Sequence, residues 1–285
     1  MFKLKIIGII SSILFLSCTE NETTVFEKQN FNENWSFQII EASKNDSLFF
    51  QENEIASNWQ LVHLQHTPKI EPKIVNNQWQ GISWYRKSFN LPKVMKNKKL
   101  FFKFEGAMNI AEVWVNEKKL IEHQGGYLPF VVDFSEVANF EKENVIAVKL
   151  NNKDNPITGP KPLEVLDFNT YGGLYRNVWL IAKNQLHITD PVLENKTASG
   201  GVFVTFPVVS DAKAIINIKT HVRNEAEKST TFLIRNTLIK NDSSLVSVET
   251  KKYSLDKNLD KEIIANINVE NPELWSPRAP NLYTI

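Results

Sequence analysis

Apolar and polar residues alternate along most of the chain, which is the pattern of β-strands with one buried face. Ala111, Val113 and Val115, for example, fall on one side of such a strand. The same spacing returns in four further sets: Ile146, Val148 and Leu150; Ile216, Ile218 and Val222; Phe232, Ile234 and Leu238; and Ile263, Ala265, Ile267 and Val269. No segment of ten or more residues keeps a helical period with capping residues. We therefore expect an all-β fold of antiparallel sandwiches and no parallel βαβ architecture.

The chain is long enough for two such sandwiches. About 255 of its 285 residues follow residue 30, which exceeds the roughly 100–150 residues that one sandwich uses. Residues 182–201 are typical of a crossing between domains, so we expect a first sandwich over 31–183 and a second over 184–285. The strand pattern of the second ends one strand early, which predicts a sandwich that is incomplete at its carboxyl terminus.

The first eighteen residues have the order of a secretory signal. Lys3 and Lys5 precede an apolar run over residues 6–16, which is too short to span a bilayer, and Cys18 follows directly after Ser17. This order is similar to that of a bacterial lipoprotein, with Cys18 as the lipid acceptor; a plain signal peptide with an incidental cysteine is the alternative. Residues 1–18 are thus the predicted signal, and residues 19–30 are a polar tether. We expect an exported protein, periplasmic or anchored to the outer membrane of a Gram-negative bacterium.

Charge and composition exclude several classes of function. The 33 Lys and Arg residues balance 32 Asp and Glu residues, so there is no basic surplus for nucleic acid. His63 and His66 have no cysteine or acidic partner at the spacing of a metal site, and no phosphate loop or nucleophile elbow is present. We therefore expect no metal and no cofactor. Cys18 is the one cysteine of the chain, so no intrachain disulfide forms.

One loop combines an acid, aromatic residues and a glycine pair. The segment "LDFNTYGGLYRNVWLI" (166–181) brings Asp167, Phe168, Tyr171 and Tyr175 together just before a predicted strand. Flat aromatic faces beside a single carboxylate suit a sugar, and glycines let the backbone take a positive φ or approach another surface closely. The same residues also suit an ordinary strand entry.

Four sequence segments, taken in order along the chain, resemble the amino-terminal sugar-binding domain of glycoside hydrolase family 2. This family includes β-galactosidases, β-glucuronidases and β-mannosidases. The resemblance implies a jelly-roll, galactose-binding-like β-sandwich, then an immunoglobulin-like β-sandwich, then a (β/α)₈ barrel with a catalytic glutamate pair. One departure is Asn116-Glu117, where the family usually has Asn-Gly, so that a tight primed turn is predicted less strongly. The four segments are "HTPKIEPKIVNNQWQGISWYRKSFNLP" (66–92), "LFFKFEGAMNIAEVWVNEKKLIEHQGGYLPFVVDFSEV" (100–137), "ENVIAVKLNN" (143–152) and "YGGLYRNVWLI" (171–181).

The resemblance also implies residues that contact sugar. In family members with galactosidase activity, an acid before the "GG(I/L)YR" strand reaches the sugar pocket of the barrel, which corresponds to Asp167. Asn76 or Asn77 is the nearest match to a second such residue. Against a binding role, Asp167 also suits an Asx turn that bonds its own backbone. Tyr171 is a candidate for stacking on a sugar ring.

For two other residues near these candidates, the sequence favours structural roles. Arg176 is typical of an ion pair or a carbonyl contact, and Trp84 is typical of a strand core, although Trp84 and Trp79 also suit sugar stacking. No Asp or Glu is assigned a catalytic role.

The given sequence reaches Ile285 without the barrel that the resemblance implies. The expected function is therefore that of the non-catalytic amino-terminal part of an exported β-galactosidase-like hydrolase. Carbohydrate, as a β-glycoside or a glycan, is the expected partner, and contact with a membrane is expected only through the lipid anchor. A lipid-anchored carbohydrate-binding module and a structural adaptor remain as alternatives.

Overall fold

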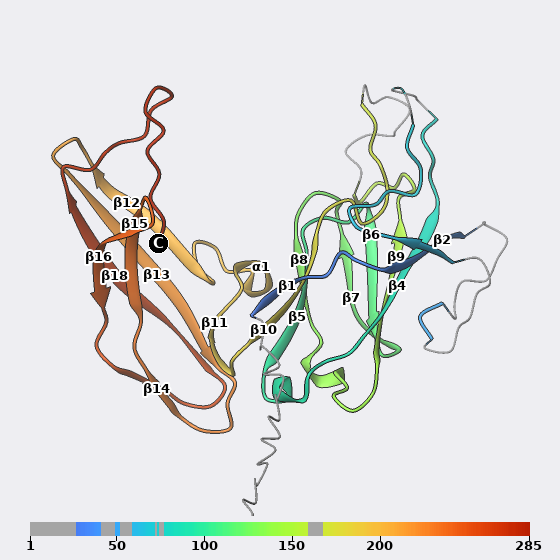
Figure 1. Ribbon diagram of the computed structural model, residues 1–285, viewed down its shortest axis with the longest axis horizontal. Helices are drawn as coiled ribbons and strands as arrows, with labels where there is room; N and C mark the ends of the chain where they lie inside the picture. Colours follow the sequence, from blue (N-terminus) through green and yellow to red (C-terminus); the bar gives the residue numbers. More distant parts are fainter. Residues whose placement is uncertain (1–26, 41–48, 52–58, 72, 74–76, 159–167) are drawn as a thin grey trace, which may run out of the picture.

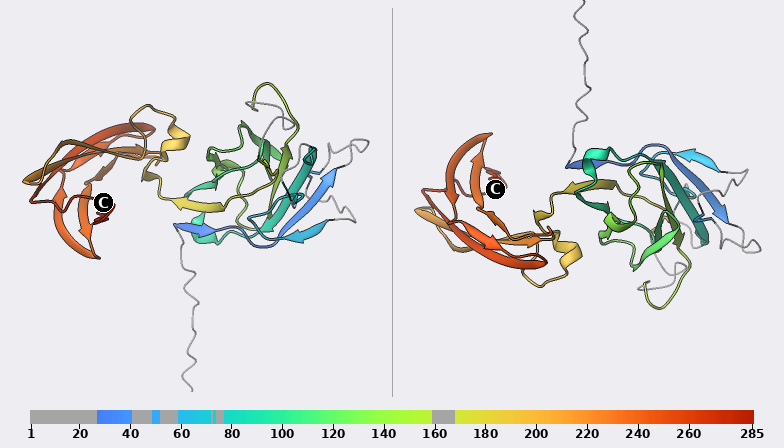
Figure 2. Two further views of the ribbon diagram at one scale, coloured as in Figure 1. Left: turned by 90° about the horizontal axis from the view of Figure 1, so that it is seen from above. Right: turned by 90° about the horizontal axis from the view of Figure 1, so that it is seen from below.

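The protein consists of two β-sandwiches that lie side by side and are joined by a short connection (Figures 1 and 2). The computed structural model describes residues 27–40, 49–51, 59–71, 73, 77–158 and 168–285. Strands dominate both halves, and the single α-helix of these ranges, α1 (Pro191–Glu194), has four residues. The predicted all-β fold is therefore confirmed.

The first sandwich packs a six-stranded sheet against a four-stranded sheet. Neighbouring strands are antiparallel throughout both sheets. In spatial order, the larger sheet contains β3 (Gln60–Val62), β2 (Trp35–Ile40), β4 (Ile82–Phe89), β9 (Asn144–Asn151), β6 (Ile110–Val115) and β7 (Lys118–Gln124), and the smaller contains β1 (Lys28–Asn30), β10 (Val178–Lys183), β5 (Lys99–Phe104) and β8 (Phe130–Asp133). Two short 3₁₀ turns are present: η1 (Lys93–Met95) precedes β5 in sequence and η2 (Ser135–Val137) follows β8.

Residues 28–30 differ from the predicted tether over residues 19–30. They form β1, whose three residues pair with Ile181, Leu180 and Trp179 of β10. All three residues of β1 are exposed, so the strand forms through main-chain pairing and carries no apolar periodicity that the sequence could reveal.

Aromatic side chains fill the space between the two sheets of the first sandwich. Phe102 of β5 is fully buried and lies with its ring centroid 4.4 Å from Phe134 and 5.1 Å from Phe31. Phe104 stacks on Phe130 with centroids 4.6 Å apart. The alternating apolar residues of β6 and β9 face the same core, as their spacing predicts.

The turn between β6 and β7 is a primed turn, although it contains no glycine. Asn116 and Glu117 both have positive φ, 49° and 67°, which is the combination that a type I′ turn requires. The Asn116 side chain holds the turn, because its Oδ1 accepts the Val145 amide at 2.9 Å and its Nδ2 donates to the Val137 carbonyl at 2.6 Å. The primed turn, which the sequence predicted only weakly, therefore forms without glycine, since side-chain anchoring by Asn116 replaces it.

Replacing Glu117 with glycine is expected to stabilise the protein by about 0.5–1 kcal/mol, because glycine adopts this φ without the steric cost that a Cβ brings. The free energy of unfolding measured in urea tests this. Lys118→Gly, one residue further in the exposed start of β7, is the matched control and should destabilise. Equal losses in both variants would contradict the strain at residue 117.

The second sandwich is built around β13, its longest strand together with β18. β13 pairs with β18 on one side and with β12 and β11 on the other. Ile216, Ile218 and Val222 face the interior, as predicted. Two antiparallel pairs cover this face: the hairpin of β15 and β16, and the pair of β14 with β17. The strands are β11 (Leu186–Ile188), β12 (Val202–Val209), β13 (Lys213–Asn224), β14 (Thr230–Phe232), β15 (Arg235–Lys240), β16 (Ser243–Glu249), β17 (Tyr253–Leu255) and β18 (Leu259–Glu270).

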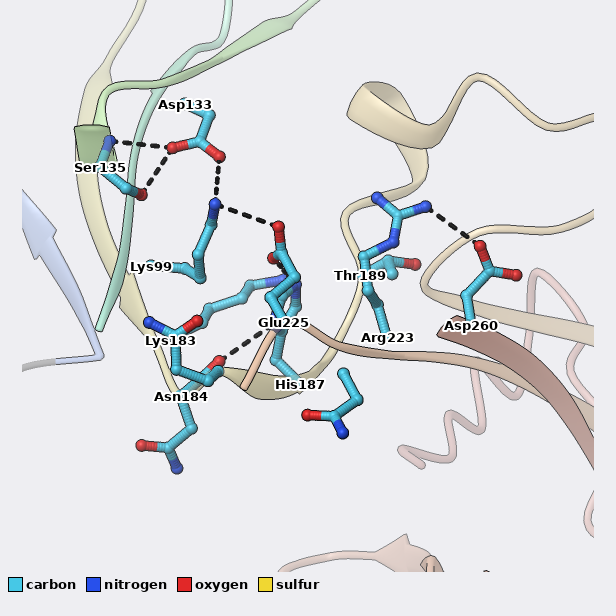
Figure 3. Close-up of polar contacts among 12 residues, drawn as sticks. Lys99, Asp133, Ser135, Lys183, Asn184, His187, Thr189, Arg223, Glu225 and Asp260 are labelled. Atoms are coloured by element: carbon cyan, nitrogen blue, oxygen red, sulfur yellow. Dashed lines mark hydrogen bonds and ion pairs between the residues drawn. The ribbon is translucent and has the colours of Figure 1, made fainter. Parts of the chain in front are cut away.

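Salt bridges and hydrogen bonds connect the two sandwiches (Figure 3). Lys99 Nζ of β5 lies 2.8 Å from the Asp133 carboxylate of its own sandwich and 3.1 Å from the Glu225 carboxylate of the second. Burial opposes the charge on Lys99, but the two carboxylates outweigh burial and raise its pKa. Lys103 pairs with Asp190 at 3.1 Å across the same junction. These contacts lie where β10 ends at Lys183.

A second charged cluster fixes the helix α1 to β13. His221 is buried, with Nδ1 2.8 Å from the Thr189 hydroxyl and Nε2 3.1 Å from the Asp260 carboxylate. Arg223 joins Asp260 at 3.3 Å and the buried Glu194 at 2.7 Å (Figure 3 shows the pair with Asp260). The hydrogen bond from His221, with the one from Arg223, lowers the pKa of Asp260 to about 2.

Because the folded pKa of Asp260 lies below its ordinary value of 3.8, its stabilisation is present above about pH 4 and is lost as the pH falls toward 2. We expect the melting temperature of the wild type to fall more steeply between pH 5 and pH 2 than that of Asp260→Asn. Thermal unfolding at several pH values tests this. Asp211→Asn, in the exposed turn before β13, is the control and should follow the wild type. Parallel curves for wild type and Asp260→Asn would contradict the assignment.

Candidate functional site

A recess of about 340 Å³ lies among the loops at one end of the first sandwich. The connections β3–β4, β5–β6, β7–β8 and β9–β10 each contribute to it. Aromatic rings dominate its wall, and the polar groups among its lining residues are amides, hydroxyls and one imidazole. The residues that line it are Gln65, His66, Thr67, Met108, Tyr127, Phe168, Asn169, Thr170, Tyr171 and Tyr175.

The glycine pair 172–173 allows the β9–β10 connection to pass close to two other segments. Gly173 has a φ of +101° and exchanges hydrogen bonds with Met108 at 3.0 and 3.2 Å. A Cβ on Gly173 would lie 2.5 Å from the His66 carbonyl oxygen and 2.7 Å from the Tyr85 hydroxyl. A Cβ on Gly172 would lie 2.8 Å from Asn152 Nδ2. The pair therefore does approach other segments closely, and two of the residues that it contacts, His66 and Met108, line the recess.

A buried glutamine orders the segment that precedes the glycines. Gln78 Nε2 donates to the Phe168 carbonyl at 3.1 Å, and Gln78 Oε1 accepts the Thr170 amide at 2.6 Å. One side chain thereby holds the main chain on both sides of Asn169. The rings and hydroxyls of residues 168–171 are thus fixed in position without regular secondary structure.

The hydroxyl groups of two tyrosines are tied back to the main chain. Tyr171 donates to the Glu71 carbonyl at 3.0 Å and accepts from Asn169 Nδ2 at 3.1 Å, while Tyr175 donates to the Gly126 carbonyl at 2.6 Å. Both rings line the recess. Pre-positioned aromatic faces with a few convergent polar groups are the arrangement that binds the apolar face and the hydroxyls of a sugar.

His66 is one of the lining residues that the sequence did not single out for this site. Its Nδ1 lies 2.8 Å from the hydroxyl of the fully buried Tyr85, and its ring packs against Phe37 with centroids 4.5 Å apart. Burial lowers the pKa of His66, which favours the neutral imidazole. The His63/His66 spacing pointed only to an unsupported metal pair. In the structure, His63 instead contacts Glu33 at 2.6 Å.

The predicted site residues have different outcomes. Tyr171 lines the recess together with Phe168 and Tyr175. Asn77 lies in an exposed turn and does not line it. Asn76, Asp167 and Cys18 lie outside the described residues, and their roles stay predictions; Asp167 directly precedes Phe168 in sequence.

The two residues for which structural roles were favoured do not line the recess. Trp84 is buried on β4 and packs against Trp114 with centroids 5.1 Å apart. The Arg176 guanidinium lies 5.7 Å from the Tyr175 ring centroid.

Across the residues that the structure describes, no group of three or more His, Cys, Asp or Glu side chains is arranged to hold a metal ion. In the same ranges, no helix has the length and apolarity needed to cross a membrane.

Two family models match most of the chain. Residues 57–184 match the sugar binding domain of glycosyl hydrolases family 2, and residues 199–285 match a second model of the same family. A β-glucuronidase from Formosa agariphila is 31% identical over 281 residues, which cover 94% of this chain and 28% of the relative. A β-galactosidase from Thermoanaerobacter pseudethanolicus is 32% identical over 259 residues, which cover 90% of this chain and 32% of the relative.

Solved structures show the same architecture. A β-glucuronidase from Bacteroides uniformis, covalently bound to cyclophellitol-6-carboxylate aziridine, superposes with a TM-score of 0.79 at 28% identity, over 90% of this chain and 29% of that one. A putative β-galactosidase from Bacteroides fragilis gives a TM-score of 0.76 at 28% identity, over 90% of this chain and 37% of that one.

The chain therefore belongs to glycosyl hydrolase family 2, and it carries the family's jelly-roll sugar-binding domain and immunoglobulin-like domain. It spans about three tenths of the length of the curated relatives described above, 28% of one and 32% of the other.

Proposed function

We propose that this chain is the non-catalytic amino-terminal part of an exported β-galactosidase-like hydrolase that acts in carbohydrate degradation. The observation that carries the proposal is the aromatic-lined recess of about 340 Å³ within the segment that matches the sugar-binding domain. Its fixed tyrosines and convergent amides suit the contacts of a β-glycoside. The names of the relatives, β-galactosidase and β-glucuronidase, support a glycoside as the partner.

The lining of the recess supports binding and not hydrolysis. Retaining glycosidases use two carboxyl groups about 5–5.5 Å apart, one as acid and base and one as nucleophile. Among the described residues that line the recess, none is an aspartate or a glutamate. This supports the proposal that the recess supplies sugar contacts and that the hydrolytic carboxylates belong to another part of the enzyme.

We expect the purified chain alone to hydrolyse no aryl β-glycoside, because the described residues that line the recess include no such carboxylate pair. The assay uses nitrophenyl β-galactoside, β-glucuronide and β-mannoside as substrates. Turnover of any of these above the buffer rate, in protein free of contaminating hydrolase, would refute the non-catalytic role.

Two sequence predictions are part of the proposal. Asp167 and one of Asn76 and Asn77 are proposed to bond sugar hydroxyls; this is supported for Asp167 by its place next to Phe168, which lines the recess. Asp167→Asn should weaken sugar binding more than Asn77→Ala, since Asn77 does not line the recess.

Export is proposed through the segment 1–18, with Cys18 as the lipid acceptor, and the lipid chain is the proposed membrane contact. Labelling with a palmitate analogue in a Gram-negative host should mark the wild type. Equal labelling of Cys18→Ala would show that lipidation at this residue is wrong.

A second candidate function is that of a lipid-anchored carbohydrate-binding module. It is favoured by the recess itself, whose described lining comes from the first sandwich alone. The downstream gene sequence distinguishes the two candidates: a continuation that encodes a barrel with paired glutamates supports the hydrolase, and its absence supports the module.

A further inference from the structure

His66 presents one defined polar group to the recess, and the buried Tyr85 determines which group that is. The imidazole lines the recess, and its Nδ1 is engaged by the Tyr85 hydroxyl at 2.8 Å. Among the described residues, none forms a hydrogen bond with the other ring nitrogen, Nε2. A ligand in the recess can therefore form a hydrogen bond with His66 through Nε2, and the tautomer decides whether Nε2 donates or accepts.

The surroundings of Tyr85 assign its proton. Tyr85 is fully buried, and burial raises its pKa, so the hydroxyl keeps its hydrogen. A buried hydroxyl hydrogen needs an acceptor, and among the described residues the acceptor within hydrogen-bond distance of the Tyr85 hydroxyl is His66 Nδ1.

A neutral imidazole that accepts at Nδ1 carries its hydrogen at Nε2. Protonation of both nitrogens would turn Nδ1 into a donor and leave the buried Tyr85 hydroxyl hydrogen without its acceptor among the described residues. The arrangement therefore holds His66 in one neutral tautomer. Gly173 makes it possible, because its lack of a side chain leaves room for the His66 carbonyl and the Tyr85 hydroxyl.

The other described residues of the lining are also uncharged. Within the described part of the chain, the recess is lined by no lysine or arginine. A carboxylate placed there would lose hydration without gaining a cationic partner from the described lining, whereas a sugar hydroxyl needs only one donor.

We propose that His66 Nε2–H is a fixed hydrogen-bond donor for a hydroxyl of a neutral pyranose, that Tyr85 is the positioning residue that fixes it, and that the recess thereby favours neutral sugars over uronates. The inference rests on the proposed sugar contacts of the recess and adds to them a sugar class and the residue that selects it.

The first test requires no ligand and no variant. Long-range ¹H–¹⁵N correlation spectra of the wild-type imidazoles report which nitrogen carries the hydrogen. We expect His66 to show the single Nε2–H tautomer near neutral pH, and Tyr85→Phe to show a mixture of tautomers with the fold retained in its amide spectrum. An Nδ1–H or doubly protonated His66 in the wild type would overturn the inference.

The second test measures affinity by NMR titration with methyl β-D-galactopyranoside and methyl β-D-glucuronide. We expect the glucuronide to bind about tenfold more weakly, because its carboxylate meets no cation. His66→Phe keeps a ring but removes the donor, and should weaken galactoside binding about fivefold, while His66→Gln keeps an N–H donor and should restore part of it.

The outcomes separate the two proposals. Either of two results would overturn this inference and leave the sugar site in place. One is that His66→Phe changes galactoside binding at the recess by less than twofold. The other is that the glucuronide binds as tightly as the galactoside. No binding of either sugar at the recess would overturn the sugar site as well.

Discussion

Gly173→Ala is expected to destabilise the first sandwich by about 3–5 kcal/mol, more than any other single substitution considered for this protein. Two effects combine at this position. A φ of +101° is strained for any residue with a Cβ. The new Cβ would also lie 2.5 Å from the His66 carbonyl oxygen, which is main chain and has little freedom to move.

Gly125 provides a matched control for Gly173. Its φ is +119°, but no atom lies within 4 Å of the place that a Cβ would take. Gly125→Ala therefore isolates the conformational cost, about 1–2 kcal/mol. Urea unfolding of both variants, with thermal melting as a second probe, measures the difference. Equal losses at the two positions would contradict the close packing of Gly173 on His66 and Tyr85.

Asn152→Leu is expected to destabilise by about 2–4 kcal/mol, because two main-chain groups lose their hydrogen-bond partner. Asn152 Oδ1 accepts the buried Gly81 amide at 2.7 Å, and its Nδ2 donates to the Trp79 carbonyl at 3.0 Å. The same amide packs under Gly172. Leucine has the same number and branching of side-chain heavy atoms as asparagine, so the substitution removes the hydrogen bonds without leaving a cavity.

Asn77→Leu is the control for Asn152→Leu, since Asn77 lies in an exposed turn. Its effect should stay within about 0.5 kcal/mol. Denaturant unfolding compares the two variants directly. If the two substitutions destabilise equally, Asn152 does not hold the 79–81 segment in the way that its contacts indicate.

Much of the fold was predictable because its strands carry strong periodic signals. Ile216, Ile218 and Val222 lie two or four residues apart on one strand and are all buried. β1 was not predictable, because Lys28, Gln29 and Asn30 bury no side chain and pair only through their main chain. The primed turn at 116–117 was underestimated for a related reason, since the groups that hold it come from residues far along the chain.

The candidate site was predictable only in part. The glycine pair and its neighbouring aromatics identified Phe168, Tyr171 and Tyr175, which all line the recess. His66 was missed, because its role depends on Tyr85 and Leu174, and nothing in the local sequence shows that these meet. Four loops from separate parts of the chain form the recess, so its full lining follows from the topology of the two sheets and not from any one motif.

The central proposal is that the recess of the first sandwich contacts a sugar. An amide-shift titration of the ¹⁵N-labelled chain with methyl β-D-galactopyranoside tests it most directly, because it locates binding without requiring catalysis. We expect saturable changes at His66, Thr67, Thr170 and Tyr171, which line the recess, and no change in the second sandwich. Unchanged spectra at high millimolar sugar, or changes confined to residues 199–285, would contradict a sugar site at the recess.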